Sequence, residues 1–436
     1  MSGRLDWRSR PAGPLRGSVR VPGDKSVSHR ALMFSALAEG TSRIHGFLEG
    51  EDTRATAAVL QRLGVRIEAP REGERVVHGV GLHGLRGSDG PLDCGNAGTG
   101  MRLLAGLLAG QAFDSTLVGD ASLSKRPMRR VTDPLFAMGA RIDTHDGLPP
   151  LHVRGGQRLH GIRYELPVAS AQVKSALLLA GLYAEGETEV IEPHPTRDYT
   201  ERMLAAFGWP IDFMPGRARL SGGHALRATD VEVPADFSSA AFFLVAASIV
   251  PGSGLRLPAV GLNPRRTGLL QALRLMGADI RVEDERTSGG EPVGDLVVRH
   301  APLHGVELPE ALVPDMIDEF PALFVAAAAA EGCTVIRGAA ELRVKESDRL
   351  ATMATGLRAL GITVDETPDG ATIHGGSLGG GVVESLTDHR IAMSFAVAGL
   401  VAQAPVRIND CRHVATSFPG FMALANGSGF ALDAVG

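Results

Sequence analysis

Four short clusters of charged and small polar residues each lie at or near the start of a run of small apolar residues. They read GDKSVSHRALM, SKRPMRRV, SAQVKSALLLAG and RVKESDRLATM, and each holds one of the chain's four lysines, Lys25, Lys125, Lys174 and Lys345. Arginine makes up the rest of the 44 basic residues. Free backbone N–H groups and the helix dipole favour anions at a helix start. The clusters therefore predict that several anionic groups are held by point charges at helix N-termini.

Two further segments share this character, a glycine-rich loop CGNAGTG at 94–100 and the charged trio of DHRIAMSF at 388–395. In VKESDRL, Lys345 and Arg349 are four residues apart, so helical spacing places them on one face, where they repel unless an anion lies between them. Separate surface pairs with Glu346 and Asp348 are the alternative. For the segment that starts at Gly23 the alternative to an anion site is a plain capped helix. The segment also lacks the spacing of a nucleotide P-loop.

The elements that position these clusters belong to a sixfold internal repeat. Each unit has a polar cluster, a helix of small apolar residues, a break and a β-branched strand, and a second helix that ends on glycine follows in five units. The first helices open near Ala31, Met101, Ala176, Ala241, Ala322 and Ala392. Each unit thus reads βαβαββ. A scaffold made by duplication, with no function implied, is the alternative interpretation of this repeat. A hinge is expected near 232–238, where Pro234 separates two halves of three units.

Composition narrows the class of protein. A net charge of −5 argues against nucleic acid as the main partner. The N-terminus lacks an apolar signal region, and the apolar runs are far shorter than a bilayer requires, so we expect a soluble, cytoplasmic protein without a membrane partner. The cysteines, Cys94, Cys333 and Cys411, lack metal-ligand spacing. They are expected to be buried or half-buried free thiols, and no metal site is expected.

Taken in this order, the motifs resemble the 5-enolpyruvylshikimate-3-phosphate synthase family from about Val21 to Phe418. The resemblance implies an α/β fold of two inside-out domains, each of three βαβαββ repeats, with ligands bound between them. One domain would comprise residues 1–22 and 235–436, and the other 23–234. The implied reaction transfers the enolpyruvyl group of phosphoenolpyruvate to the 5-hydroxyl of shikimate 3-phosphate and releases phosphate. This reaction is a step of aromatic amino acid biosynthesis and needs no cofactor. The resemblance also implies that the protein is a target of glyphosate, and we expect a monomer.

The resemblance also implies roles for single residues. Asp318, Glu346 and Lys25 would be catalytic, with Asp318 as the base for the hydroxyl and Glu346 serving C3 of phosphoenolpyruvate. The implied substrate-binding residues are Lys25, Ser26, Arg30, Asn96, Gly98, Arg126, Ser170, Gln172, Arg197, Asp318, Lys345, Arg349 and Arg390. Two positions depart from the common pattern, Ala171 in the SAQ triplet and Thr416 in place of a lysine. Lys174 could reach phosphate or lie along its helix.

Two other functions stay open. The sister enzyme that acts on UDP-N-acetylglucosamine usually carries a reactive cysteine before the arginine that matches Arg126, but here that region reads GDASLSKRP, with Ala121 and no cysteine. A catalytically dead ligand-binding member would be expected to lose Asp318, Glu346 or a lysine, and all are present.

Overall fold

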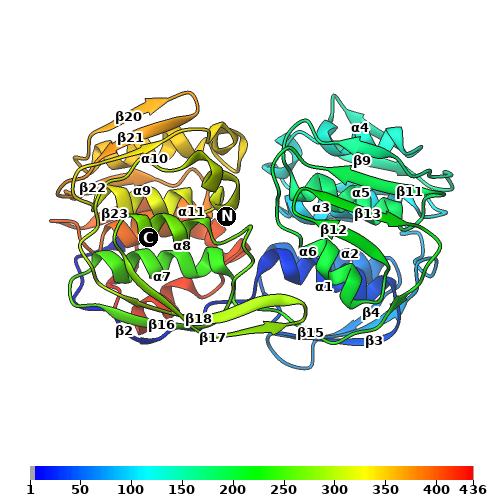
Figure 1. Cartoon of the computed structure of the whole chain (residues 1–436), viewed down its shortest axis with the longest axis horizontal. Coiled ribbons are helices and arrows are strands. Elements are labelled where there is room, and N and C mark those ends of the chain that lie inside the picture. Colours follow the sequence, from blue (N-terminus) through cyan, green and yellow to red (C-terminus); the bar gives the residue numbers. More distant parts are fainter. Residues whose placement is uncertain (1–4, 436) are drawn as a thin grey trace. The chain divides into compact units, whose positions relative to one another are not determined.

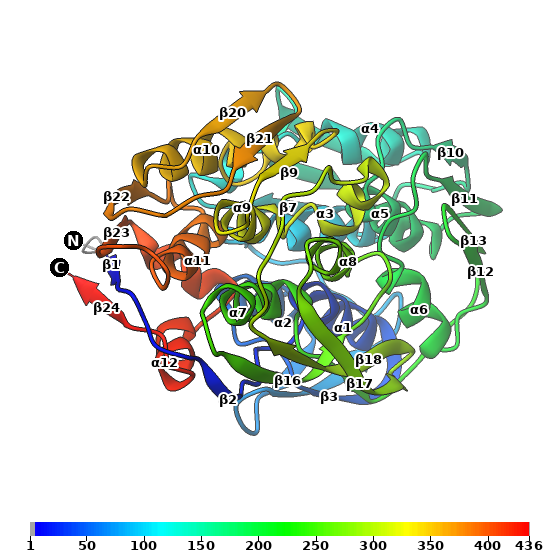
Figure 2. The same cartoon turned by 60° about the vertical axis from the view of Figure 1, so that its left-hand side comes forward.

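The computed structural model describes residues 5–435 and divides the chain into two compact units. The first unit contains the residues up to Pro22, Ala235–Arg286 and the residues from Pro292 onward; the second contains Gly23–Pro234 and Thr287–Glu291. The chain passes between them after Pro22 and after Pro234 and, in addition, at the tip of one hairpin. Figure 1 and, in a turned view, Figure 2 show that both units consist of helices enclosed by sheets.

The second unit has three central helices, three outer helices and three sheets. Its central helices are α1 (Lys25–Leu37), α3 (Gly98–Ala109) and α5 (Ala171–Gly181), and its outer helices are α2 (Glu51–Arg62), α4 (Arg129–Ala137) and α6 (Tyr199–Ala206). In strand order, its sheets are β14 (Leu226–Arg227), β3 (Ala38–His45), β5 (Glu74–Val80) and β4 (Arg66–Glu68), with β15 (Val231–Glu232) also paired to β3; β6 (Leu92–Asp93), β7 (Ser115–Val118), β9 (Leu148–Arg154) and β8 (Arg141–His145); and β10 (Arg163–Glu165), β11 (Glu187–Ile191), β13 (Arg217–Ser221) and β12 (Ile211–Met214).

The first unit repeats this plan. Its central helices are α7 (Phe237–Ile249), α9 (Phe320–Ala328) and α11 (His389–Ala398), and its outer helices are α8 (Gly268–Leu275), α10 (Arg349–Ala359) and α12 (Phe421–Gly427). Its sheets are β17 (Asp279–Ser288), β18 (Glu291–Arg299), β16 (Gly254–Gly261) and β2 (Arg16–Ser18); β19 (Cys333–Ile336), β21 (Gly370–His374) and β20 (Val364–Thr367); and β22 (Gly381–Glu384), β23 (Val406–Asn409), β1 (Asp6–Ser9) and β24 (Leu432–Val435).

The sheets share one pairing pattern, which reflects the repeat. In the sheet of β10, β11, β13 and β12, the first pair is parallel and the next two are antiparallel. The sheets of β6, β7, β9 and β8 and of β22, β23, β1 and β24 follow the same order. The parallel pair joins strands on either side of a helix, as a βαβ connection requires, and the antiparallel pairs follow. The βαβαββ unit predicted from the sequence is therefore present.

Two of the central helices, α7 and α9, are apolar on every side and are surrounded by protein. α7 runs FSSAAFFLVAASI without a charged residue, and each of its side chains is buried. α9 is also buried throughout its length, Phe320–Ala328. A helix with a single apolar stripe needs cover on one side only, whereas a helix that is apolar all round must be enclosed. Each large apolar side chain so buried contributes ~1.5–3 kcal/mol.

Aspartates fix where several of these helices begin. Asp24 accepts a hydrogen bond from the backbone N–H of Val27 at 2.9 Å, and Asp388 accepts one from that of Arg390 at 2.9 Å. Asp236 caps α7 in the same way. An N-cap of this kind is worth ~1 kcal/mol, and the remaining N–H groups of the first turn still point out of the helix. The polar clusters of the sequence therefore lie at helix starts, as predicted.

The outer helices also end where the sequence predicts. The glycine two residues beyond each of five of them has a left-handed backbone, at Gly64, Gly139, Gly208, Gly277 and Gly361. Glycine adopts this conformation without strain and closes the last turn. In the stretch 5–435, no helix has both the length and the apolar character needed to cross a bilayer.

Gly106 lies where α3 packs against α5, and there is no space for a side chain. A Cβ at this position would lie 2.1 Å from the carbonyl oxygen of Ala176. We predict that Gly106→Ala lowers the free energy of unfolding by ~1–3 kcal/mol, because the helices must separate to admit the methyl group. The measurement is the midpoint of urea unfolding. Gly427→Ala is the matched helical control, because nothing lies within 4 Å of its added Cβ; equal midpoints for the two variants would contradict the prediction.

Candidate active site

Arg30 is a buried cation of α1 whose hydrogen bonds go to neutral groups. Its guanidinium donates to Thr200 Oγ1 at 2.7 Å, to Ser175 Oγ at 2.8 Å and to the carbonyl oxygen of Ser26 at 2.9 Å. Burial lowers the pKa of Arg30 to about 10, and the nearby Arg197 adds to the shift. An anion placed between these two arginines would relieve their repulsion and accept charge-assisted hydrogen bonds. The pair is therefore suited to a phosphate or carboxylate.

Lys25 adds a second cation at the start of α1. Its Nζ lies 2.5 Å from Oδ2 of Asp52, which is buried in the first turn of α2. Burial lowers the pKa of His29 well below its ordinary value, and Lys25 and Arg30 lower it further. The imidazole is thus neutral at physiological pH, and its Nδ1 lies 2.8 Å from Thr56 Oγ1. The first turn of α1 therefore concentrates positive charge around an uncharged ring.

Gly98, the first residue of α3, lies beside two guanidinium groups. A Cβ at Gly98 would be 2.9 Å from Arg126 Nη1 and 3.3 Å from Arg102 Nη1. Arg126 Nη2 donates to Asn96 Oδ1 at 2.7 Å, which ties the arginine to the loop before the helix. The missing side chain therefore lets both cations approach a helix N-terminus, and this combination binds anions.

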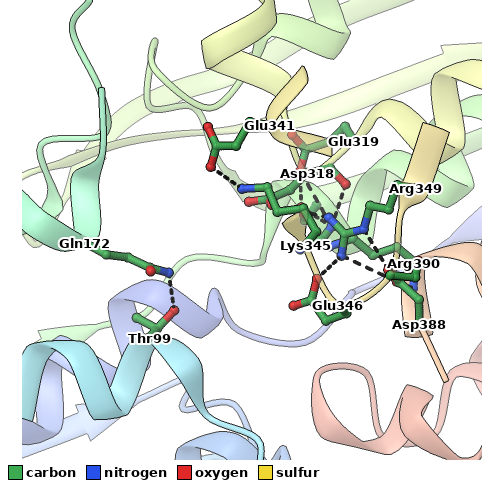
Figure 3. A network of polar contacts seen from close by, with 12 residues as sticks. Thr99, Gln172, Asp318, Glu319, Glu341, Lys345, Glu346, Arg349, Asp388 and Arg390 are labelled. Atoms are coloured by element: carbon green, nitrogen blue, oxygen red, sulfur yellow. Dashed lines mark hydrogen bonds and ion pairs between the residues drawn. The ribbon is translucent and has the colours of Figure 1, made fainter. Parts of the chain in front are cut away.

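Gln172 connects α5 to α3 (Figure 3). Its Oε1 accepts from Arg102 Nη1 at 2.8 Å and its Nε2 donates to Thr99 Oγ1 at 2.9 Å. Because a guanidinium only donates, these two contacts fix which end of the amide is the oxygen. Ser170, the N-cap of α5, accepts from the backbone N–H of Val173. Ser170 and Gln172 thus sit at the start of a central helix, as Lys25 and Gly98 do.

Lys174 is an internal cation. Its Nζ lies 2.8 Å from Glu192 Oε2 and 2.7 Å from Glu201 Oε1, and all three side chains are buried. Burial by itself lowers the pKa of Lys174, but Glu201 and Glu192 outweigh it and raise that pKa above its ordinary value. Glu192 also accepts from the backbone N–H of Thr196 at 3.2 Å, the residue before Arg197. Lys174 therefore holds the loop that carries Arg197.

Asp318 is at the centre of the polar network of the first unit (Figure 3). Its Oδ2 accepts from Arg266 Nη1 at 2.8 Å, and its Oδ1 lies 3.6 Å from Arg349 Nη1. Arg390 donates to the Asp318 carbonyl oxygen at 3.1 Å. Residues before α8, in α10 and in α11 thus converge on the segment before α9. Three cations hold one carboxylate and its backbone in place.

Arg349 is buried and forms two further ion pairs of this network. Its Nε lies 2.8 Å from Asp388 Oδ2 and its Nη2 lies 2.5 Å from Glu346 Oε2. Burial by itself lowers the pKa of Arg349, but Asp388 and Glu346 raise it well above its ordinary value. Lys345 is more accessible, and its Nζ lies 2.6 Å from Glu341 Oε1. Figure 3 shows Glu346 and Asp388 on the same arginine.

The expectation that Lys345 and Arg349 share a helix face is wrong. The short 3₁₀ helix η3 (Ala340–Val344) ends before Lys345, whose backbone is extended. Asp348 then caps α10, which begins at Arg349. The cap stops the helix from extending backwards, so the two cations belong to different segments and have different partners. Arg349 pairs with Glu346, so the alternative of separate ion pairs holds for this contact, although Arg349 is buried.

Within each unit, the structure brings predicted site residues to the starts of helices. The charged residues that contact them and that sequence reasoning missed include Asp52, Arg102 and Arg266. A signal for Arg266 existed: the segments before the second helices of other repeats carry Arg126, Arg197 and Lys345, and Arg266 has the matching place before α8. Among residues 5–435, no group of His, Cys, Asp or Glu is arranged to hold a metal ion.

The fold is that of the enolpyruvyl transferases. The structure of the enolpyruvyl transferase NikO from Streptomyces tendae matches with a TM-score of 0.81, covering 99% of each chain at 19% identity, a likeness of fold alone. The EPSP synthase of Acinetobacter baumannii matches with a TM-score of 0.90 and 53% identity, covering 99% of this chain and 100% of the other. The predicted fold class is therefore confirmed.

The sequence comparisons define the family. The model of the EPSP synthase (3-phosphoshikimate 1-carboxyvinyltransferase) family matches residues 9–424. The 3-phosphoshikimate 1-carboxyvinyltransferase of Xanthomonas axonopodis pv. citri (strain 306) is 72% identical over 431 residues, covering 99% of this chain and 98% of the relative. That of Xanthomonas campestris pv. campestris (strain B100) is 72% identical over 429 residues, covering 98% of each. The chain belongs to the EPSP synthase family, so the resemblance found in the sequence is confirmed, and the chain is a transferase.

We predict that Lys174→Met destabilises the protein by ~3–5 kcal/mol, because it leaves two buried glutamates without their cation. Burial raises the pKa of Glu201 even in the presence of Lys174. Without Lys174 the Glu201 carboxyl group would favour protonation in the folded state still more, so stability is retained at low pH and lost as pH rises through its folded-state pKa. Thermal unfolding at pH 5 and pH 8 measures this. The loss should be larger at pH 8 and partly reversed by adding Glu201→Gln; a loss that does not depend on pH would contradict the prediction.

Proposed function

We propose that this chain transfers the carboxyvinyl (enolpyruvyl) group of phosphoenolpyruvate to the 5-hydroxyl of shikimate 3-phosphate and releases phosphate. Membership of the EPSP synthase family supports this reaction. The structural observation that carries it is the gathering of cations at or just before the starts of central and outer helices in a chain of net charge −5. The two substrates bring together roughly six negative charges on two phosphates and two carboxylates. Such ligands require a local concentration of positive charge, which these cations provide although the protein as a whole is acidic.

The cations of the second unit are assigned to the two phosphate-bearing substrates. Arg30 and Arg197 suit the phosphate of shikimate 3-phosphate, because Arg30 is buried among neutral donors and acceptors and has no carboxylate among its direct partners. Lys25, Ser26, Ser170 and Gln172 complete that set in our proposal. Asn96, Gly98 and Arg126 are assigned to phosphoenolpyruvate, and from the first unit Lys345, Arg349 and Arg390 are assigned to the same substrate.

The carboxylates of the first unit are assigned to proton transfer. The 5-hydroxyl adds to C2 of phosphoenolpyruvate while C3 gains a proton, and the tetrahedral adduct then loses phosphate. In our proposal Asp318 accepts the hydroxyl proton and Glu346 is the acid that protonates C3, with Lys25 assisting. Both carboxylates contact Arg349, which fixes their positions. Correctly placed acid–base groups contribute ~10²–10⁴-fold each.

We also propose that the protein works in the cytoplasm as a monomer on small molecules. The addition and the elimination of phosphate require proton transfer and stabilisation of charge from the protein. The side chains above provide groups for both, so in our proposal the reaction needs no cofactor. The net charge of −5 supports small anionic ligands over nucleic acid as partners.

The experiment that tests the reaction is phosphate release from phosphoenolpyruvate with either of two acceptors. We expect release with shikimate 3-phosphate and none with UDP-N-acetylglucosamine. Release with the sugar nucleotide alone would keep the fold and overturn the substrate. Release with neither acceptor, from a folded protein that still binds shikimate 3-phosphate, would indicate a ligand-binding member without catalytic activity.

Replacement of the proposed base should separate catalysis from binding. Asp318→Asn keeps the size of the side chain and its contact with Arg266, but the amide is not a useful base, so we expect kcat to fall by ~10²–10⁴-fold. The Kd of shikimate 3-phosphate should change far less. Steady-state phosphate release and equilibrium binding measure the two quantities. The control is Asp143→Asn, an exposed carboxylate paired with Arg154; near-normal kcat in Asp318→Asn would rule out the proposed role.

Gly98 should control access to phosphoenolpyruvate and its mimics. The methyl group of Gly98→Ala would lie 2.9 Å from Arg126 Nη1 and displace that guanidinium. We expect the KM of phosphoenolpyruvate to rise about tenfold, which corresponds to ~1.4 kcal/mol, with a smaller change for shikimate 3-phosphate. We expect the unaltered chain to be inhibited by glyphosate when phosphoenolpyruvate is near its KM, and the variant to be less sensitive. Full activity of the unaltered chain at millimolar glyphosate would refute this expectation.

A further inference from the structure

A thiol, an imidazole and a carboxylate form a row across the sheet of β19, β21 and β20, outside the site described above. Cys333 Sγ lies 3.1 Å from His374 Nδ1, and His374 Nε2 lies 2.9 Å from Asp365 Oδ2. Cys333 and His374 are direct cross-strand partners in the antiparallel pair β19–β21, and Asp365 lies on β20, which pairs with the other edge of β21. Figure 1 shows β20 and β21 at the outside of the first unit. Three hydrogen-bonded strands thus hold the row in place.

The carboxylate determines which ring nitrogen of His374 carries the proton. An ionised carboxylate accepts hydrogen bonds and cannot donate, so Nε2 is the donor toward Asp365, and Nδ1 is left as an acceptor. The thiol of Cys333 can then donate to Nδ1. A nucleophile beside a base that a third group orients is the arrangement that activates cysteine. His374 also donates its backbone N–H to the carbonyl oxygen of Thr363 at 3.0 Å, which fixes the strand that carries it.

The other two cysteines have different surroundings. Cys94 and Cys411 are buried free thiols, as expected from the sequence, and burial raises the pKa of both, that of Cys94 to about 12. Cys333 is exposed, so the expectation of a buried or half-buried thiol is wrong for this residue. As the first residue of an outer strand it points away from the core, whereas the next residue, Thr334, is buried. The chain therefore has one accessible thiol, and this thiol has a base beside it.

The same row occurs in the first repeat with a hydroxyl in place of the thiol. Thr41 and His78 are cross-strand partners on β3 and β5, and Thr41 Oγ1 lies 3.2 Å from His78 Nδ1. His78 Nε2 lies 2.9 Å from Glu68 Oε1 on β4. The repeat thus provides the geometry independently of sulfur, and cysteine at position 333 adds a nucleophile to it.

We propose that Cys333 is a modification site that forms a reversible mixed disulfide with small organic disulfides, with His374 as its base and Asp365 as the positioning residue. In the forward step His374 Nδ1 takes the thiol proton and Cys333 Sγ attacks one sulfur of R–S–S–R. The S–S bond of the reagent breaks as the new S–S bond forms, and the leaving RS⁻ takes the proton from the imidazolium. The Cys333 sulfur is oxidised and the leaving sulfur is reduced, so the exchange balances without another reactant.

The test is the rate at which the folded full-length chain reacts with the aromatic disulfide 5,5′-dithiobis(2-nitrobenzoate). We expect one fast equivalent of released thiolate, located at Cys333 by peptide mass mapping, and the same site modified by oxidised glutathione. His374→Gln should slow the fast phase about tenfold or more, in line with loss of a general base, and Asp365→Asn should slow it by less. His78→Gln is the matched control, a half-buried histidine in the corresponding row, and should leave the rate unchanged.

Two further variants make the outcome decisive. Cys333→Thr copies the residue of the first repeat, so it should fold, lack the fast phase and keep the phosphate-release activity. Cys333→Thr with Thr41→Cys moves the thiol to the first row, and a fast phase that depends on His78 should appear. Equal rates for the unaltered chain and His374→Gln would overturn the proposal, because the thiol would then be exposed without being activated. Slow or absent reaction at Cys333 in the folded chain would overturn it as well.

Discussion

Enclosure of the central helices is the constraint on which the rest of the structure depends. α7 and α9 are buried along their whole length, so any polar group on them must lie at an end, where the chain enters or leaves the core. The N-terminal ends carry free N–H groups and the positive end of the helix dipole. The same constraint that makes the helices apolar thus concentrates polar side chains, caps and cations at their first turns. The candidate site follows from the architecture and is not an addition to it.

The ion pairs of the site fall into two groups that differ in burial. Lys174 with Glu192 and Glu201 is enclosed, and so is Arg349 with Asp388. Such pairs gain little net stability from their formation but cost several kcal/mol when one partner is removed, so they act as fixed parts of the scaffold. Lys25 and Lys345 are each about one-fifth exposed and each pair with a single carboxylate. A substrate anion can compete for these two lysines at low cost.

The repeat made most of the fold predictable, because each unit copies the same helix stops and strand pattern. The starts of the central helices were also predictable, since Asp24 and Ser170 are good caps. Partners distant in sequence were not. No local pattern joins Arg266 to Asp318 across 52 residues, and their contact depends on how two repeats pack. Spacing also misled where a cap intervenes: four residues separate Lys345 from Arg349, but the helix begins only at the second of them.

Two buried arginines show why sequence motifs alone cannot assign roles to charges. Both Arg30 and Arg349 lie in motifs that indicate anion binding, but their pKa values shift in opposite directions. Arg30 has hydroxyls and a carbonyl as hydrogen-bond partners, so burial dominates and its charge is poorly compensated. Arg349 is surrounded by carboxylates, which more than offset its burial. Arg30 therefore has the environment of a cation that gains from a bound anion. Arg349 already contacts Asp318 and Glu346, so in our proposal it holds the two proton-transfer groups in place in addition to binding phosphoenolpyruvate.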